Sequence, residues 1–200
     1  NTYKPEIVNV SVIKDWQDNN DQDGKRPDTL TINLLKKLDE ETAEPAVIKT
    51  VVLPEQNSWS KTWENLPKYE NGKLIIYTVE EVTTEGETTL PWVADYHCGA
   101  AELISVNNYK ITNTHTPEKT EATVTKVWDD KDDQDGQRPQ SLEVTLSNGT
   151  KVTLNEGNEW TAKVENLPKY ADGKEIEYTW TEGKLPEGYE LTETKVKGTV

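Results

Sequence analysis

The sequence predicts an all-β protein built from two tandem β-sandwiches. Short segments rich in β-branched and aromatic residues, each bounded by Gly, Pro, Asn or Asp, follow one another along the 200 residues. No segment has the apolar period of an amphipathic helix. The stretch Val12–Trp16 (VIKDW) returns 112 positions later as Val124–Trp128 (VTKVW), and the turn that follows it returns with it. Many short strands repeated twice indicate one sandwich per repeat.

Each expected strand follows from its own composition and period. In the first copy, Val10, Val12, Lys14 and Trp16 share one face of the opening strand because alternate residues of a strand point the same way. The later strands of this copy are expected at 29–35, 46–53, 58–63, 73–83 and 109–114. Those of the second copy are expected at 122–128, 141–146, 151–154, 159–164 and 175–181, with Asn148-Gly149 as a two-residue hairpin turn.

The spacing of the repeat places the domain boundary and an insertion. The offset between the copies falls from 112 at Pro27/Pro139 to 101 at Trp59/Trp160, so the first copy carries 11 extra residues, which we expect in a longer hairpin loop at 36–45. The polar, proline-containing segment 114–120 divides the chain into domains 1–116 and 117–200. No Asn or Asp follows Glu182, so the closing strand of the second domain is expected to be missing from this chain.

Composition excludes several classes of partner. The formal net charge of −15 disfavours nucleic acid and anionic lipid, because binding phosphate needs a basic face. No apolar run is long enough to span a bilayer, so no membrane contact is expected. Cys98 is the single cysteine, which rules out a disulfide within the chain. Nothing in the sequence calls for a cofactor.

Three polar residues lie where apolar ones are expected. Lys14, Glu81 and Asn113 each fall on the core-facing row of a separate strand, where an unpartnered polar group is costly. Burial favours the neutral form of an amine and of a carboxylic acid. A neutral lysine is a nucleophile, and a neutral glutamic acid can polarise the asparagine carbonyl and shuttle protons while ammonia leaves. The product is an amide between the Lys14 and Asn113 side chains, favoured by high effective concentration in a packed core.

The second copy repeats two of these three groups. Lys126 stands at the position of Lys14, and Glu182 at that of Glu81. No residue of this chain matches Asn113, so we expect no such bond in the second copy as it stands.

These residues sit in long motifs that resemble the collagen-adhesin B-type (Cna-B) domain of Gram-positive surface proteins. The motifs are KDW at 14–16, DQDGKRP at 21–27, LPKY at 66–69, YTVEE at 77–81 and ITNTHTP at 111–117, with counterparts at 126–128, 133–139, 167–170 and 177–182. The resemblance implies reverse-immunoglobulin-like sandwiches whose first and last strands are joined by a self-formed Lys–Asn isopeptide bond. It assigns the bond to Lys14 and Asn113, with Lys126 as the unpartnered equivalent, and the proton shuttle to Glu81 and Glu182.

The resemblance also implies a role and a place. It implies a structural stalk module of a cell-wall-anchored adhesin or pilus-like protein on the bacterial surface, with neighbouring repeats of the same protein as partners. A bond that forms once per molecule is not turnover, so the chain is not expected to be an enzyme. A rival interpretation is a binding module that grips a host protein or glycan through the insertion and the segment 85–98. Trp92, Tyr96 and Cys98 in that segment have no expected counterpart in the second copy.

Simpler interpretations stand beside these. Lys14 alone could extend to solvent from a strand end or pair with an acid. Asn19, Asp21 and Asp23 match the first ligands of a calcium loop, but Leu30 stands where the bidentate glutamate belongs, so an Asp-capped turn is favoured and no metal site is expected. His97 and Cys98 are adjacent on a strand and point to opposite faces, which disfavours a catalytic dyad. No nucleophile–base–orienter set for a hydrolase is present.

Overall fold

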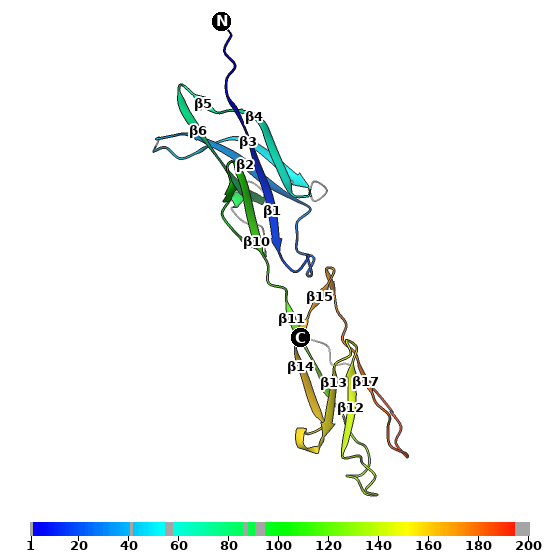
Figure 1. Ribbon diagram of the computed structural model, residues 1–200. Helices are drawn as coiled ribbons and strands as arrows, with labels where there is room; N and C mark the ends of the chain where they lie inside the picture. The colour runs from blue at the N-terminus through cyan, green and yellow to red at the C-terminus, as the bar shows by residue number, and fades with distance from the viewer. Residues whose placement is uncertain (1, 41, 55–57, 86–87, 91–94, 195–200) are drawn as a thin grey trace. The chain divides into compact units, whose positions relative to one another are not determined.

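The computed structural model describes residues 2–40, 42–54, 58–85, 88–90 and 95–194 (Figure 1). The chain divides into two compact units: unit 1 comprises Asn1–Pro117 with Asp172–Lys174, and unit 2 comprises Glu118–Ala171 with Glu175–Val200. The prediction of an all-β fold is confirmed, since strands dominate both units and the helical content described is one short 3-10 turn, η2 (Glu156–Asn158). Within the described residues, no helix is long and apolar enough to cross a membrane.

Unit 1 is formed by two sheets. The first has the order β4-β1-β10-β8 with β9 beside β10, and the second has the order β3-β2-β6-β5 with β7 beside β6. The strands are β1 (Ile7–Gln17), β2 (Thr29–Leu38), β3 (Ala46–Pro54), β4 (Ser60–Pro67), β5 (Tyr69–Glu70), β6 (Lys73–Glu85), β7 (Thr88–Leu90), β8 (His97–Cys98), β9 (Glu102–Ser105) and β10 (Asn108–Thr114). The first and last long strands, β1 and β10, are adjacent and parallel (Figure 1).

Alternation along the strands builds the core of unit 1. Val10 and Val12 of β1 are 0% and 2% exposed, and the intervening residues face outward. Their row packs with that of β2 and β6 in one apolar cluster: Val10, Val12, Leu30, Ile32, Leu34, Leu53, Trp59, Trp63, Leu66, Ile75, Tyr77, Val79 and Ile111. Burying a side chain of this size stabilises the fold by about 1.5–3 kcal/mol. Lys14 lies on the buried row of β1 and Glu81 on the buried row of β6, so both side chains border the apolar cluster.

Unit 2 contains smaller sheets. The pairs β11-β14 and β15-β16 and the three-stranded β13-β12-β17 are formed by β11 (Lys119–Thr125), β12 (Ser141–Leu146), β13 (Lys151–Asn155), β14 (Thr161–Pro168), β15 (Tyr170–Ala171), β16 (Lys174–Glu175) and β17 (Trp180–Glu182). Its core is split into one cluster around Leu146 and another around Leu154.

Two strands of unit 2 are shorter than the sequence suggests. The expected strand 122–128 ends at Thr125, so Lys126 and Trp128 follow β11 instead of lying within it. In unit 1 the matching strand is held on one edge by β4 and on the other by β10, whereas β11 pairs only with β14 among the described residues. In place of the expected strand 175–181, the structure has β16 at Lys174–Glu175 and β17 at Trp180–Glu182, because β12 pairs only with Trp180–Glu182.

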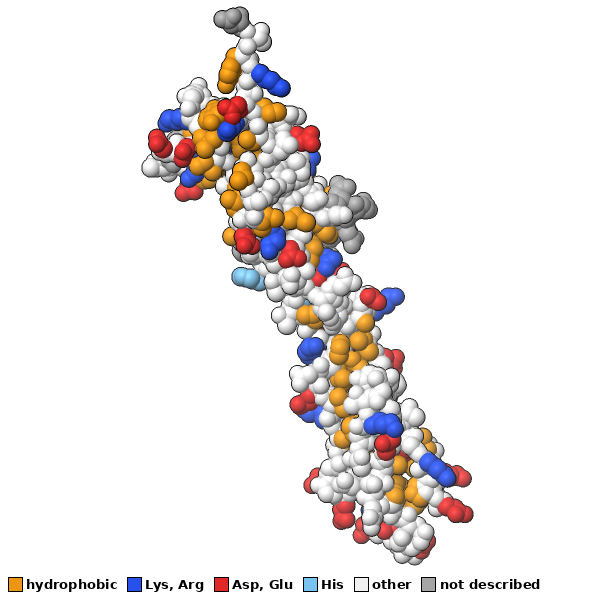
Figure 2. All heavy atoms as spheres, viewed as in Figure 1, with side chains coloured by type: hydrophobic (Ala, Val, Ile, Leu, Met, Phe, Trp, Pro, Cys, Tyr) orange, Lys and Arg blue, Asp and Glu red, His pale blue; other side chains and the backbone are white. Residues whose placement is uncertain are grey.

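The insertion of the first copy lengthens a hairpin. Strands β2 and β3 have 10 and 9 residues, whereas their counterparts β12 and β13 have 6 and 5. The extra residues therefore extend both strands as well as the loop that joins them. On the face shown in Figure 2, Lys and Arg side chains are interspersed with Asp and Glu side chains.

Candidate functional site

The first sheet of unit 1 brings Lys14 and Asn113 onto neighbouring strands. Strand β1 runs parallel to β10, with Lys14 opposite Ile111 and Trp16 opposite Asn113. Because side chains two positions apart share a face, Lys14 and Asn113 both point toward the second sheet. Asn113 is 0% exposed.

The second sheet supplies the group that connects them. Glu81 lies on β6, opposite Ile32 of β2, at the end of the buried row that contains Tyr77 and Val79. Lys14 Nζ lies 2.5 Å from Glu81 Oε2, and the Asn113 amide Nδ2 donates a hydrogen bond to Glu81 Oε1 at 2.7 Å. The structure therefore brings the three sequence-predicted residues together on one carboxylate. Lys14 does not extend to solvent.

Burial controls the chemistry of this cluster. The side chains of Lys14 and Glu81 are 1% and 3% exposed. Burial lowers the pKa of Lys14 from its ordinary value, although the charge and hydrogen bond of Glu81 oppose the change. The Asn113 carbonyl oxygen Oδ1 is buried with no hydrogen-bond partner in the structure. An amine with a lowered pKa beside an unengaged amide carbonyl and a shared carboxylate can undergo acyl transfer.

Cys98 lies beside the same carboxylate, which the sequence did not reveal. Its Sγ is 3.8 Å from Glu81 Oε1, and its backbone is opposite Asn113 across the β8–β10 pair. A pocket of about 510 Å³ runs along this side of the cluster, lined by Thr78–Glu81, Cys98–Ala101 and Tyr109. His97, next to Cys98, is exposed on the opposite face, so the two form no dyad.

Unit 2 contains the lysine and the glutamate of this site as the pair Lys126 and Glu182. Lys126 Nζ lies 2.6 Å from Glu182 Oε1, and both side chains are 14% exposed. Among the described residues, none donates a hydrogen bond to the buried Glu182 Oε2, and no side-chain amide occupies the place that Asn113 takes on Glu81. The pair is accordingly less buried than Lys14 and Glu81.

A second polar cluster lies next to the first, and sequence reasoning missed most of it. Asp18, which is 1% exposed, accepts hydrogen bonds from Arg26 Nε at 2.8 Å, Arg26 Nη2 at 2.6 Å and the Tyr96 hydroxyl at 2.8 Å. Burial alone would raise the pKa of Asp18, but these donors and the Asp21 amide lower it to about 2. The signal available in the sequence was an aspartate followed eight positions later by arginine in both copies.

The turn itself is capped by aspartates, as predicted. Asp18 Oδ1 accepts from the Asp21 amide, and Asp21 Oδ1 accepts from the Arg26 amide, each at 3.0 Å. Among the described residues, no group of three His, Cys, Asp or Glu side chains could hold a metal ion. The carboxylates of this turn are directed at protein donors.

One prediction about the second copy is wrong. Tyr96 was expected to have no counterpart there, but the Tyr189 hydroxyl donates to Asp130 Oδ2 at 2.9 Å, as the Tyr96 hydroxyl donates to Asp18. The two tyrosines are 93 positions apart, so the repeat offset of 112 or 101 does not align them. Trp92, the other aromatic residue expected to be special to the first copy, lies outside the described residues.

His115 fastens the end of β10 to the same turn. Its Nδ1 is 2.8 Å from the Asp95 carbonyl oxygen and its Nε2 is 2.9 Å from Asp23 Oδ2. A carbonyl and a carboxylate both accept, so the ring satisfies both only when both nitrogens carry protons. Burial alone would lower the pKa of His115, but the hydrogen bonds and charges of Asp23 and Asp95 raise it above 6.5.

This arrangement predicts a pH-dependent contribution to stability. Because the folded pKa of His115 is raised, its contribution is fully present below about pH 6.5, the pKa of an unfolded histidine, and is lost as pH rises through the folded value. His115→Gln is expected to cost about 1–3 kcal/mol at about pH 5.5 and less at about pH 8.5, measured by urea unfolding. The exposed His97→Gln is the matched control. An equal His115→Gln cost at both pH values would contradict the imidazolium.

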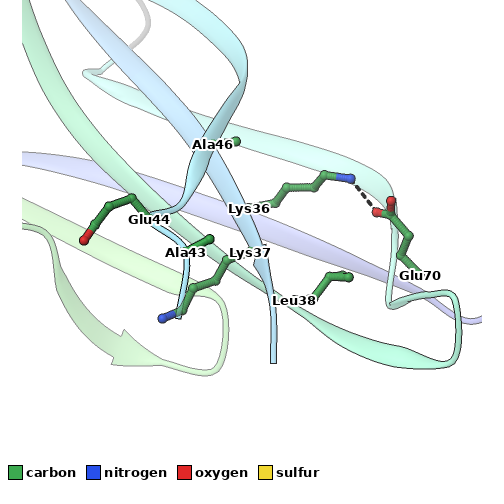
Figure 3. A pocket seen from close by; sticks show the side chains of 7 residues that line it. All are labelled: Lys36, Lys37, Leu38, Ala43, Glu44, Ala46 and Glu70. Carbon is green, nitrogen blue, oxygen red and sulfur yellow. Dashed lines mark hydrogen bonds and ion pairs between the residues drawn. The ribbon is translucent and has the colours of Figure 1, made fainter. Parts of the chain in front are cut away.

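The insertion offers a second pocket, of about 260 Å³, that bears on the rival interpretation. It is lined by Lys36, Lys37, Leu38, Ala43, Glu44, Ala46 and Glu70 (Figure 3). Lys36 forms an ion pair with Glu70 across it. The two acidic and two basic side chains of this lining thus balance in charge, and it has no charge preference that would define a ligand.

Comparison with known proteins agrees with this architecture. A sequence model of the Cna protein B-type domain matches residues 10–114 and 122–200. The collagen adhesin of Staphylococcus aureus is 42% identical over 187 residues, which is 91% of this chain and 14% of that protein. The crystal structure of two B repeat units of the collagen binding protein of S. aureus superposes with a TM-score of 0.74 at 37% identity, covering 92% of this chain and 46% of that one.

These matches bear directly on the predicted resemblance and fold. The family match covers both repeats separately, at residues 10–114 and 122–200. The predictions of a Cna-B resemblance and of the corresponding β-sandwich fold are confirmed. The chain belongs to the Cna protein B-type domain family and contains two copies of its domain.

Proposed function

We propose that unit 1 is a self-crosslinking stalk module, in which a Lys14–Asn113 isopeptide bond joins the first strand to the last. The chain is a Cna-B repeat module of the adhesin type, and the bond explains why such a module places a lysine, a glutamate and an asparagine in its core. The observation that carries the proposal is the shared carboxylate: Glu81 contacts the Lys14 amine at 2.5 Å and the Asn113 amide at 2.7 Å.

The reaction can be written with these three side chains alone. A proton passes from the Lys14 ammonium to Glu81, which leaves a neutral amine and a neutral acid, as burial favours. Rotation of the Asn113 amide by about 180° brings Oδ1 to the acid, because the oxygen and nitrogen of an amide occupy equivalent places. The acid proton then polarises the carbonyl while Nζ attacks the side-chain carbon of Asn113.

Collapse of the tetrahedral intermediate completes the exchange. Glu81 accepts one of the two protons of the attacking nitrogen, which keeps the other as the amide N–H, and delivers a proton to Nδ2, which leaves as ammonia. One C–N bond forms and one breaks, with no oxidant or cofactor. Packing supplies the high effective concentration that such a reaction requires. Since the bond forms once per molecule, the domain is a structural element that modifies itself and has no turnover.

The location of the bond suggests its purpose. Tension enters unit 1 at β1 and leaves at β10, and a covalent link between these strands carries the load around the hydrogen-bonded sheets. The S. aureus relatives are described as a collagen adhesin and a collagen binding protein. We infer that this chain serves as a repeat in the stalk of a protein exposed on a bacterial cell surface, with neighbouring repeats as its partners.

Intact-protein mass spectrometry tests the bond. The full chain is expected to weigh less than the sum of its residues by one ammonia, because unit 1 completes its bond and unit 2 lacks the amide partner. Lys14→Ala, Glu81→Ala and Asn113→Ala are each expected to restore the full mass, whereas Lys126→Ala is expected to retain the ammonia deficit. A wild-type chain of full mass, shown to be folded, would exclude the crosslink.

A further inference from the structure

Both units contain the same set of contacts around an equivalent tryptophan, Trp16 in unit 1 and Trp128 in unit 2. In unit 1, Lys14 Nζ lies 4.9 Å from the centre of the Trp16 ring, and Tyr96 packs edge-on against that ring at 5.0 Å. In unit 2, Lys126 Nζ lies 4.7 Å from the Trp128 ring, and Tyr189 packs edge-on against it at 5.1 Å.

The tyrosine is fixed in both units by an aspartate–arginine pair. Asp18 binds Arg26 and the Tyr96 hydroxyl at distances of 2.6–2.8 Å. In unit 2, Asp130 accepts from Arg138 Nε at 2.9 Å, from Arg138 Nη2 at 2.5 Å and from the Tyr189 hydroxyl at 2.9 Å. We call Asp18, Arg26 and Tyr96 the tyrosine clamp of unit 1, and Asp130, Arg138 and Tyr189 that of unit 2.

A second tryptophan also contacts each ring. Trp59 packs edge-on against Trp16 at 5.3 Å, and Trp160 packs edge-on against Trp128 at 5.1 Å. Backbone hydrogen bonds connect each lysine to this second tryptophan. The backbone N–H of Lys14 donates to the Trp59 carbonyl oxygen, and the backbone N–H of Lys126 donates to the Trp160 carbonyl oxygen. The indole therefore has little freedom to leave the amine.

The comparison between the units separates the clamp from the bond. Unit 2 has the complete clamp, although no amide contacts Glu182 there. Lys126 Nζ still lies 4.7 Å from the centre of the Trp128 ring, although the Lys126 side chain is more exposed than that of Lys14. The clamp therefore does not require a side-chain amide in contact with the glutamate. It is a preformed part of the site.

We propose that Asp18, Arg26 and Tyr96 are positioning residues that hold the Trp16 indole over the Lys14 amine and so aim this nucleophile at Asn113. Asp130, Arg138 and Tyr189 hold Trp128 over Lys126 in the same way. The role in unit 1 rests on the proposed crosslink, whereas the effect on Lys126 does not. An aromatic face restricts a nearby amine and excludes water from it, and small displacements of a reacting group slow a proximity-driven reaction strongly.

The first test uses Lys126, whose amine stays free in the full chain. The protons of its terminal methylene group are expected to resonate upfield of those of an exposed lysine, because the Nζ bonded to that group lies 4.7 Å from the centre of the Trp128 ring. Tyr189→Phe removes only the hydroxyl of the clamp and is expected to lose most of this displacement in the NMR spectrum. Tyr178→Phe, which removes a hydroxyl that donates to the Pro168 carbonyl at 2.8 Å, is the matched control. An unchanged Lys126 shift in folded Tyr189→Phe would overturn the clamp.

The second test measures the reaction in unit 1. Chain kept unfolded in guanidinium is diluted to refold, and the loss of ammonia is followed by mass against folding by circular dichroism. Tyr96→Phe is expected to fold and to form the bond at least about tenfold more slowly than wild type. Tyr77→Phe, which removes a hydroxyl that donates to the Pro67 carbonyl, is expected to react at the wild-type rate.

Arg26→Lys keeps the charge but not the two-pronged contact with Asp18, and a slower reaction is expected from it too, which preserves the test should Tyr96→Phe fail to fold. Wild-type rates in folded Tyr96→Phe and Arg26→Lys would overturn the clamp and leave the crosslink intact. A wild-type chain that folds without losing ammonia would instead overturn the crosslink and with it the role in unit 1. The Lys126 shift would then still decide whether the clamp holds the amine in unit 2.

Discussion

Stretching single molecules by their two termini is expected to release an additional length on the order of 300 Å when Asn113 is replaced by alanine. Asn113 lies 99 positions after Lys14, and each extended residue contributes about 3.3–3.6 Å. In the crosslinked wild type this segment is closed into a loop outside the load path, so only unit 2 lengthens. Force spectroscopy should therefore record one unfolding event for wild type and two for Asn113→Ala.

A matched substitution on the same strand separates the bond from local packing. Asn108 also lies on β10, but its amide binds Ser105 and the Val106 carbonyl, away from Glu81. Asn108→Ala is expected to give the single wild-type event. Two events in folded wild type, with the released length of unit 1, would show that force passes through its sheets and would refute the load-bearing role.

Replacing Glu81 with alanine is expected to lower the free energy of unfolding of unit 1 by more than about 5 kcal/mol. Two losses combine. A crosslink that closes a loop of about 100 residues contributes roughly 4–5 kcal/mol, by analogy with disulfides. Removing one partner of a buried ion pair costs about 3–5 kcal/mol, because the Lys14 amine is then left without its carboxylate. Calorimetric unfolding of the full chain measures the transition of unit 1 beside that of unit 2.

Two controls divide this cost. Glu80 is the neighbouring glutamate on the exposed face of β6, where it accepts a hydrogen bond from Asn33, and Glu80→Ala is expected to cost less than about 1 kcal/mol. The double variant Lys14→Met with Glu81→Leu lacks the bond and leaves no buried charge, so it should lose the crosslink contribution and the Asn113 hydrogen bond to Glu81 but not the cost of an unpaired buried charge. Equal transition temperatures for Glu81→Ala and Glu80→Ala would refute both contributions.

The sequence predicted the fold class because its information is local and periodic. Alternation placed Val10, Val12 and Lys14 on one inward row, and the structure has all three buried. The repeat predicted two sandwiches with equivalent strands, and the motifs indicated the family. The residues at which strands end were less predictable, as in 122–128, since a strand extends only where a neighbouring strand pairs with it.

The candidate site divides in the same way. An unexpected lysine, glutamate and asparagine on core-facing rows could be selected from the sequence, because polar residues in such rows need a partner. Their meeting on one carboxylate depends on how two sheets face each other, which no local pattern encodes. No local pattern indicates for this reason that Cys98 contacts Glu81 or that His115 contacts Asp23.

By itself the sequence determined the fold class, the duplication and the residues that are out of place in a hydrophobic row. Only the tertiary structure decided that Glu81 bridges Lys14 and Asn113, and that Tyr96 and Tyr189 occupy equivalent places despite their different spacing in the chain. The physical reason is that side-chain alternation is fixed by the backbone over a few residues, whereas contacts between sheets depend on the packing of strands that are distant in the chain.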